Sequence, residues 1–113
     1  MYEYLSKIVS VYDGDTVRAD IDLGFGVWLQ NQKIRLFGID APEMRGSDRE
    51  KAKGKESRDW LRDQLKDQAV TIQTIRDRKG KYGRWLGRLI VKGVDLNQKM
   101  VEEGLAVDYM ADS

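Results

Sequence analysis

Three segments with the composition of β-strands open the chain, and only short turns separate them. Apolar and β-branched residues dominate residues 5–12, 16–23 and 27–39. The first turn is Asp13-Gly14, a strong signal for a hairpin with a type I′ turn, whose two central residues need positive φ. The second turn is Gly24-Phe25-Gly26. The first third of the chain is therefore predicted to be a three-stranded antiparallel meander.

The next segment, residues 47–66, has a helical pattern. Ser47 can act as N-cap, and Glu50 three residues later completes a capping box. Gly54 lies inside this segment and should cost the helix about 1 kcal/mol relative to alanine. The apolar positions that recur near the helical period are Ala52, Trp60, Leu61 and Leu65. A long helix is predicted here.

The last third of the chain predicts a second hairpin and a short helix. Alternating apolar residues occupy residues 70–74 and 85–91, with a turn around Gly80 and Gly83 between them. Residues 95–103 are typical of a short helix, with Asp95 as N-cap and Gly104 as its stop. Residues 105–110 are expected to form a last short strand.

The order of these elements predicts the fold class. Five strands, with a long helix after the third and a short helix after the fifth, give an α+β domain with the order of a five-stranded OB-type Greek-key β-barrel. At 113 residues the chain is expected to be one domain, residues 1–113, that buries about two thirds of its unfolded surface. This fold alone indicates only binding of nucleic acid or sugar.

Composition excludes several kinds of chemistry. The chain has no cysteine and no histidine, so disulfides, thiolate metal sites and imidazole bases are excluded. A metal ion must then be held by oxygen, which favours Ca²⁺ or Mg²⁺ over zinc. No apolar stretch approaches the roughly 20 residues that span a bilayer, and no signal peptide is evident. The expected compartment stays open between an intracellular, a phage-encoded and a mature secreted protein.

Acids and arginines on separate β-like segments form the candidate site: Asp15, Arg35, Asp40, Glu43 and Arg84. Carboxylates at neighbouring strand ends can converge on one cation, with a main-chain carbonyl such as that of Ala41 and waters completing the shell. Glu43 is the candidate general base, because no histidine or cysteine is present. Each residue alone also fits a turn, a cap or a surface ion pair.

The two arginines suit a phosphate. Arg35 alternates with two apolar neighbours, so its guanidinium must be paired or face a ligand. Arg84 ends Lys81-Tyr82-Gly83-Arg84, where the glycine allows close approach of the backbone. Arg84 lies in a basic stretch with interleaved aromatics, residues 76–88. This stretch suits a nucleic acid strand, but taken alone it fits a solvated hairpin tip better. Metal-assisted phosphodiester cleavage is the chemistry that uses the whole set.

In combination, these motifs resemble the staphylococcal nuclease (thermonuclease) family. They are Asp13-Gly14-Asp15-Thr16, the segment from Arg35 to Glu43 with its Asp40-Ala41-Pro42, and Lys81-Tyr82-Gly83-Arg84, and the likeness runs from about Ile8 to Tyr109. The resemblance implies that Ca²⁺ is bound by Asp15, Asp40 and the Ala41 carbonyl. It implies catalytic roles for Arg35, Glu43 and Arg84, and substrate contacts for Lys81, Tyr82 and Tyr109. The implied reaction is hydrolysis of DNA and RNA, preferring single strands and leaving 3′-phosphates.

Two departures from the family pattern stand out. Family members often continue into a third, C-terminal helix, and this chain is expected to fold without it, as a monomer or with weak self-association. The net charge is only +1, which predicts weak nonspecific binding to nucleic acid. The alternatives to a nuclease are a noncatalytic nucleic-acid-binding module on the same barrel and a calcium-dependent structural domain.

Overall fold

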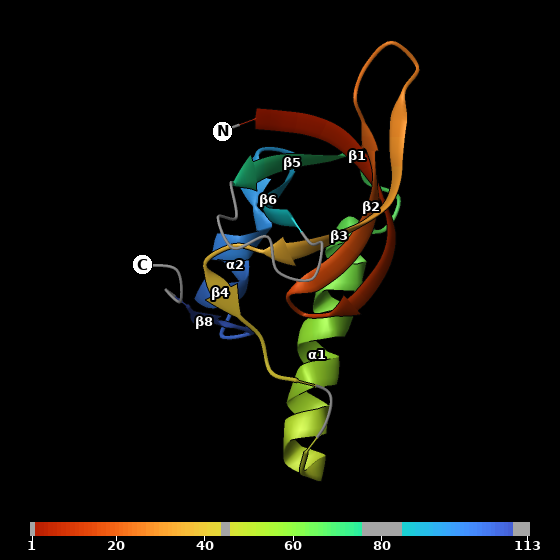
Figure 1. Ribbon diagram of the computed structural model, residues 1–113. Coiled ribbons are helices and arrows are strands. Elements are labelled where there is room, and N and C mark those ends of the chain that lie inside the picture. Colours follow the sequence, from red (N-terminus) through yellow and green to blue (C-terminus); the bar gives the residue numbers. More distant parts are fainter. Residues whose placement is uncertain (1, 44–45, 76–84, 110–113) are drawn as a thin grey trace.

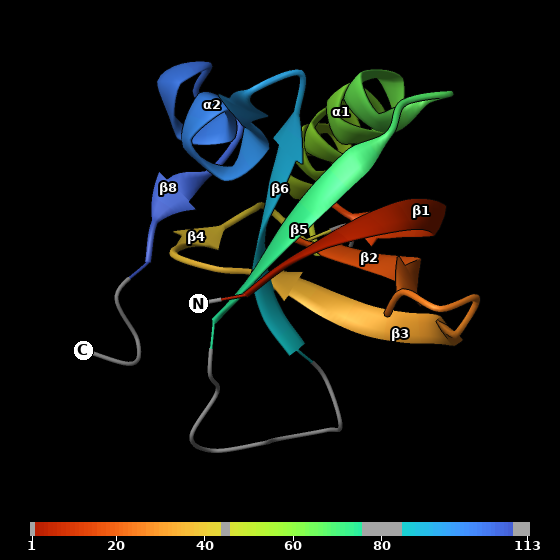
Figure 2. The same ribbon diagram turned by 90° about the horizontal axis from the view of Figure 1, so that it is seen from above.

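The computed structural model describes residues 2–43, 46–75 and 85–109, and within them five strands close into a barrel (Figures 1 and 2). The strands are β1 (Tyr2–Asp13), β2 (Thr16–Asp22), β3 (Trp28–Leu36), β5 (Val70–Ile75) and β6 (Trp85–Val91). Neighbours in the order β3-β2-β1-β5-β6 are antiparallel. A parallel pairing of β3 with β6, from Ile34 opposite Trp85 to Leu36 opposite Gly87, closes the ring. The predicted OB-type barrel is confirmed.

Three two-residue strands extend this plan: β4 (Ile39–Asp40), β7 (Val94–Asp95) and β8 (Val107–Asp108). The third strand was expected to run to residue 39, but it ends at Leu36, because the chain turns at Gly38 with φ 79°. The chain restarts as β4, which pairs with β8 in a small separate sheet. The last strand is also shorter than the predicted 105–110, because Leu105 and Ala106 are buried in the core instead.

The two helices begin where their caps predict. In α1 (Asp48–Leu65), Ser47 Oγ accepts a hydrogen bond from the Glu50 N–H at 3.3 Å. In α2 (Leu96–Glu102), Asp95 Oδ1 accepts one from Gln98 N–H at 3.2 Å. Neither helix combines the length and the apolar composition that a membrane-spanning helix requires in the described part of the chain.

The buried face of α1 differs from the expected one. Its buried residues are Gly54, Ser57, Leu61 and Leu65, whereas Ala52 is exposed and Trp60 is partly exposed. Small residues occupy this face because α1 lies close to other backbone there. Ser57 Oγ, for example, donates to the Leu105 carbonyl at 2.6 Å. The glycine that should weaken an isolated helix is therefore part of its packing face.

The turn between β1 and β2 is not the predicted type I′ turn. Asp13 pairs with Thr16, so the two loop residues are Gly14 and Asp15, and none of these residues has positive φ. Gly14 is needed for close approach instead. A Cβ there would lie 2.7 Å from Ala41 Cβ and 2.8 Å from Ser57 Cβ. The turn therefore packs tightly against both α1 and Ala41, the residue that follows β4.

Asn97 fixes the end of β3 against β6. Its side chain is 1% exposed, and its Nδ2 donates to the carbonyls of Phe37 and Gly87 at 2.9 and 3.0 Å. Its Oδ1 accepts from Leu89 N–H at 3.2 Å. One buried amide from α2 therefore satisfies three main-chain groups where the barrel closes. One of these groups belongs to Phe37, which lies between Arg35 and Asp40 in the sequence.

Candidate active site

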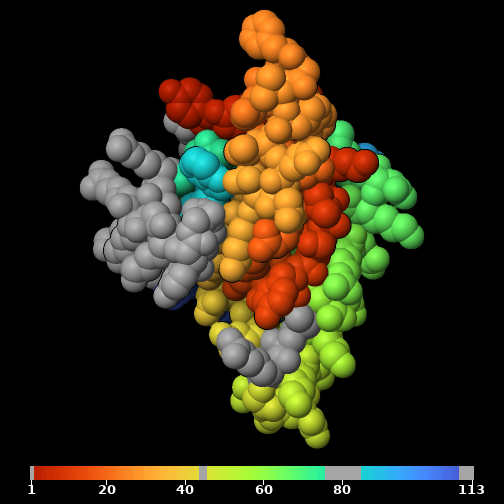
Figure 3. Space-filling model, turned by 45° about the vertical axis from the view of Figure 1, so that its right-hand side comes forward, coloured from red at the N-terminus to blue at the C-terminus, as the bar shows by residue number. Residues whose placement is uncertain are grey.

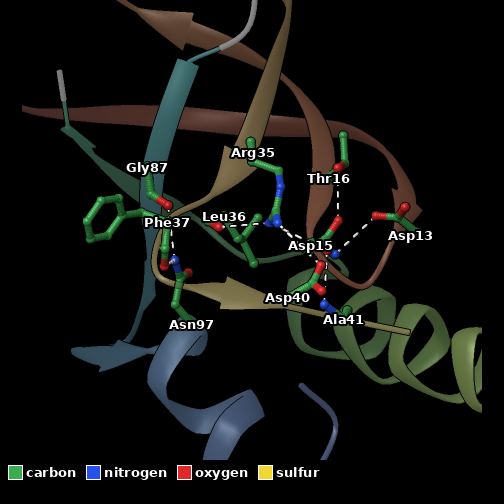
Figure 4. A network of polar contacts seen from close by, with 10 residues as sticks. All are labelled: Asp13, Asp15, Thr16, Arg35, Leu36, Phe37, Asp40, Ala41, Gly87 and Asn97. Carbon is green, nitrogen blue, oxygen red and sulfur yellow. Dashed lines mark hydrogen bonds and ion pairs between the residues drawn. The ribbon is translucent and has the colours of Figure 1, made fainter. Parts of the chain in front are cut away.

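Asp15, Arg35 and Asp40 meet at one end of the barrel (Figure 4). Arg35 Nη1 lies 3.4 Å from Asp15 Oδ2, and its Nη2 lies 3.5 Å from Asp40 Oδ1. Nη1 also donates to the Leu36 carbonyl at 3.0 Å. Asp15 comes from the β1–β2 turn, Arg35 from β3 and Asp40 from β4. The convergence of the two predicted carboxylates with the predicted arginine is thus present in the structure.

Asp15 is the most firmly held member of this group. Its Oδ2 accepts from Ala41 N–H at 3.0 Å and its Oδ1 from Thr16 Oγ1 at 3.1 Å. Its own N–H donates to Asp13 Oδ1 at 3.1 Å, and its carbonyl accepts from Leu36 N–H at 2.8 Å. The residue is 7% exposed. Asp40, by contrast, has a side chain that is 54% exposed, so one carboxylate is fixed while the other faces solvent.

Acidic groups crowd this end of the barrel. Burial, together with the hydrogen bond and negative charge of Asp15, raises the pKa of Asp13 to about 6. Burial and then the charge of Asp15 also raise the pKa of Asp40, while the charge of Arg35 opposes that rise. Three carboxylates against one guanidinium leave the cluster with a net negative charge. A nearby cation would offset this negative charge.

Replacing Asp13 by asparagine is expected to stabilise the calcium-free protein at pH 7. The pKa of Asp13 in the folded protein, about 6, exceeds its ordinary value of 3.8. Protonation of Asp13 therefore adds to the stability of the fold below pH 3.8, and this contribution is lost as the pH rises through about 6. Asparagine keeps the Oδ1 acceptor for Asp15 N–H. After allowance for screening at this half-exposed side chain, the gain should be about 1 kcal/mol. Urea unfolding in chelator checks this, and a gain that persists unchanged at pH 4 contradicts it.

Of the other predicted residues, the structure describes Ala41, Glu43 and Tyr109. Ala41 is 6% exposed, and its N–H donates to the Asp15 carboxylate. Glu43 is exposed, and its negative charge contributes to the raised pKa of Asp40. Tyr109 is 48% exposed, and its N–H donates to the Gly38 carbonyl at 2.9 Å, which places it beside β4 and not in the network of Figure 4. Lys81, Tyr82 and Arg84 lie outside the described residues.

Sequence reasoning missed several supporting residues. Thr16 and Asp13 both bind Asp15, and both stand in the Asp-Gly-Asp-Thr motif that singled out Asp15 alone. Gly14 was assigned to turn geometry when its role is close packing. Asn97 carried no signal beyond a polar residue in a short amphipathic helix. Only its burial and three hydrogen bonds show its role.

The donor set fits a hard cation. The side-chain oxygens of Asp15 and Asp40 both face the Arg35 guanidinium, and oxygen is the ligand type that Ca²⁺ prefers. Within residues 2–43, 46–75 and 85–109, no group of three or more His, Cys, Asp or Glu side chains is arranged so that it could hold a metal ion. Two carboxylates with a main-chain carbonyl and water, the predicted set, would hold the ion without such a cluster.

Comparison with known proteins adds independent evidence. A family model described as staphylococcal nuclease homologue matches residues 33–113, which include Arg35, Asp40 and Glu43. Thermonuclease from Staphylococcus hyicus is 31% identical over 105 residues, which cover 92% of this chain and 59% of that protein. Thermonuclease from Staphylococcus intermedius is 34% identical over 104 residues, covering 91% and 57%. Endonuclease Htp3 from Saprolegnia parasitica is 27% identical over 120 residues, covering 91% and 54%. The chain spans less than three fifths of the length of each of these relatives.

Proposed function

This chain belongs to the staphylococcal nuclease homologue family, and on that premise we propose that it is a Ca²⁺-dependent nuclease. It hydrolyses phosphodiester bonds of DNA and RNA, prefers single strands, has little sequence specificity and leaves 3′-phosphates. The observation that carries the proposal is the convergence of Arg35 with Asp15 and Asp40. This convergence places carboxylates that can bind a cation next to a guanidinium that can bind a phosphate.

Arg35 is held in a way that leaves it available to a phosphate. Its contacts with the two carboxylates, at 3.4 and 3.5 Å, are longer than the roughly 2.7–2.9 Å of strong charge-assisted hydrogen bonds. A guanidinium has five N–H donors in a planar fork. The carboxylates and the Leu36 carbonyl thus orient Arg35 without using all of its donors. A phosphate can then be bound by the remaining donors.

The protein residues divide the work as follows. Arg35, with Arg84 as its proposed partner, binds the scissile phosphate and neutralises the charge that grows on it in the transition state. Glu43 accepts the proton of the attacking water. Asp15 and Asp40, with the Ala41 carbonyl, would hold the calcium ion. When bound, that ion would supply positive charge that stabilises the phosphate.

Incubation with denatured DNA tests the proposal. Cleavage is expected in Ca²⁺ and not in chelator. Asp40→Asn should raise the Ca²⁺ concentration for half-maximal activity by about tenfold, because one of two carboxylate ligands loses its charge. Asp63→Asn, an exposed acid on α1, is the matched control and should leave that concentration unchanged. Equal cleavage in chelator contradicts the calcium role, and binding without cleavage places the domain in the noncatalytic class.

A further inference from the structure

The hairpin of β2 and β3 has one face in the core and one outside. Partners in an antiparallel pair share a face. By register, the pairs on the core side are Val17–Ile34 and Ile21–Leu29, although Leu29 is exposed near the hairpin tip. The pairs on the other side are Thr16–Arg35, Arg18–Lys33 and Asp22–Trp28, and Thr16 is buried among them. A β-bulge between Ala19 and Ile21 absorbs one extra residue of β3. Trp28, Lys33 and Arg18 therefore lie on the same face as Arg35 of the candidate active site.

Arg18 and Lys33 are two like charges directly opposite each other. Such a pair is destabilising when nothing neutralises it. Arg18 Nη1 donates to the Asn31 carbonyl at 3.2 Å, but neither residue has an ion pair with any part of the chain that the structure describes. An anion from outside the chain can neutralise both. Arg18 and Lys33 lie two residues along their strands from the Thr16–Arg35 pair, a distance of about 7 Å.

The acids on this face have other roles. Asp20 Oδ1 accepts from Asn31 N–H, and Asp22 Oδ1 accepts from Gly24 N–H, each at 2.8 Å. These bonds hold the bulge and the bend of the hairpin. Lys7 of β1 lies directly opposite Asp20, so these two opposite charges offset each other. Asp20 and Asp22 keep their negative charge in these bonds, but both lie farther along β2 from the Thr16–Arg35 pair than Arg18 does, so Arg18 and Lys33 are the charges next to Arg35.

Trp28 supplies an aromatic surface at the far end of this face. It is 47% exposed and lies beside the hairpin tip, where Phe25 is fully exposed. From Thr16 to Asp22 the face extends about 20 Å at ~3.3 Å per residue. In Figure 3 the side chains of β2 and β3 form one continuous strip from that tip, at the top, down toward the segment around residues 39–43.

We propose that Arg18, Lys33 and Trp28, the β2–β3 track, bind the single strand of nucleic acid that continues beyond the cleaved phosphate. Arg18 and Lys33 contact phosphates next to the one on Arg35, and a base stacks on Trp28. The track rests on the proposed nuclease function for the position of the cleaved phosphate. Its 20 Å correspond to about six nucleotides at the ~3.4 Å spacing of a stacked strand.

The length dependence of binding tests the track without any substitution. Labelled oligothymidylates of 2 to 12 nucleotides are titrated with the unchanged protein in chelator, with fluorescence anisotropy as readout. Affinity is expected to rise at least tenfold between three and about eight nucleotides and then to level off. An affinity that is already constant from three nucleotides upward overturns the track.

Substitutions then locate the binding. Arg18→Gln/Lys33→Gln is expected to weaken binding of the 12-mer about tenfold and to lower the slope of log affinity against log salt by about 1.4, the value for two phosphates of a single strand. Trp28→Ala should weaken it about tenfold without changing that slope. Lys51→Gln/Lys55→Gln, two exposed lysines of α1, removes the same charge and should leave binding unchanged. Equal losses in both double variants overturn the proposal.

Cleavage by the unchanged protein is measured separately, so the two proposals can fail independently. Length-dependent binding that needs Arg18, Lys33 and Trp28 supports the track even if no cleavage occurs. Cleavage with binding that ignores these residues overturns the track and leaves the nuclease intact. Binding of anionic lipid vesicles without binding of oligonucleotides also overturns it, in favour of a membrane surface. Circular dichroism confirms that each variant is folded.

Discussion

Arg35→Ala is expected to lower kcat/KM for denatured DNA by about 10³-fold or more while the barrel stays folded. Two effects combine. The scissile phosphate would lose a guanidinium whose side chain is only 13% exposed and which faces Asp15 and Asp40. Asp15 and Asp40 also lose the positive charge between them, so their mutual repulsion grows. Initial rates at saturating Ca²⁺, with circular dichroism and thermal unfolding on the same samples, measure the result.

Two further substitutions sharpen this test. Arg35→Lys keeps the charge but loses the planar fork, so most of the activity should still be lost if bidentate contact with phosphate matters. Arg49→Ala removes an exposed arginine from α1 and should retain full activity. Arg84→Ala, outside the described residues, is expected to match Arg35→Ala. Normal cleavage by folded Arg35→Ala would rule out the proposed site.

Gly14→Ala is expected to cost about 2–3 kcal/mol of unfolding free energy, or about 10 °C in Tm. The new Cβ would lie 2.7 Å from Ala41 Cβ and 2.8 Å from Ser57 Cβ. Both are Cβ atoms attached to backbone, so neither can move aside as the end of a long side chain could. The turn that holds Asp15 would have to shift away from Ala41, whose N–H binds the Asp15 carboxylate. Differential scanning calorimetry gives the stability change, and the Ca²⁺ requirement of cleavage should rise with it.

Controls separate crowding from backbone strain. Gly24→Ala introduces a side chain at φ 84° with nothing within 4 Å, and should cost about 1 kcal/mol through strain alone. Gly14→Ala/Ala41→Gly removes one of the two clashing atoms and should recover part of the loss. A Gly14→Ala protein as stable as the unchanged one would show that the turn relaxes freely, against the packing argument.

Local sequence patterns were enough to predict most of the fold. The meander, the two caps and the hairpin of β5 and β6 depend on residues near one another in sequence, where turn chemistry and periodicity act directly. The errors came where distant backbone intervenes. The conformation of the turn at Gly14 is set by its packing against α1 and the segment that continues β4. The buried face of α1 includes Gly54 and Ser57, because small residues let the helix approach the core closely.

For the candidate site, sequence alone determined which residue types can perform the chemistry and which local segments carry them. The absence of histidine and cysteine left carboxylates as the candidate metal ligands and general base, because composition limits chemistry whatever the fold. The motifs around Asp15, Arg35, Asp40 and Glu43 then singled out these residues. The tertiary structure decided what these residues touch. The β2–β3 pairing, with Thr16 opposite Arg35, places Asp15 beside Arg35, and this part follows from the predicted meander. Asp40 reaches them because the chain turns at Gly38 and the Ala41 N–H binds the Asp15 carboxylate, a contact between separate segments that no local pattern encodes.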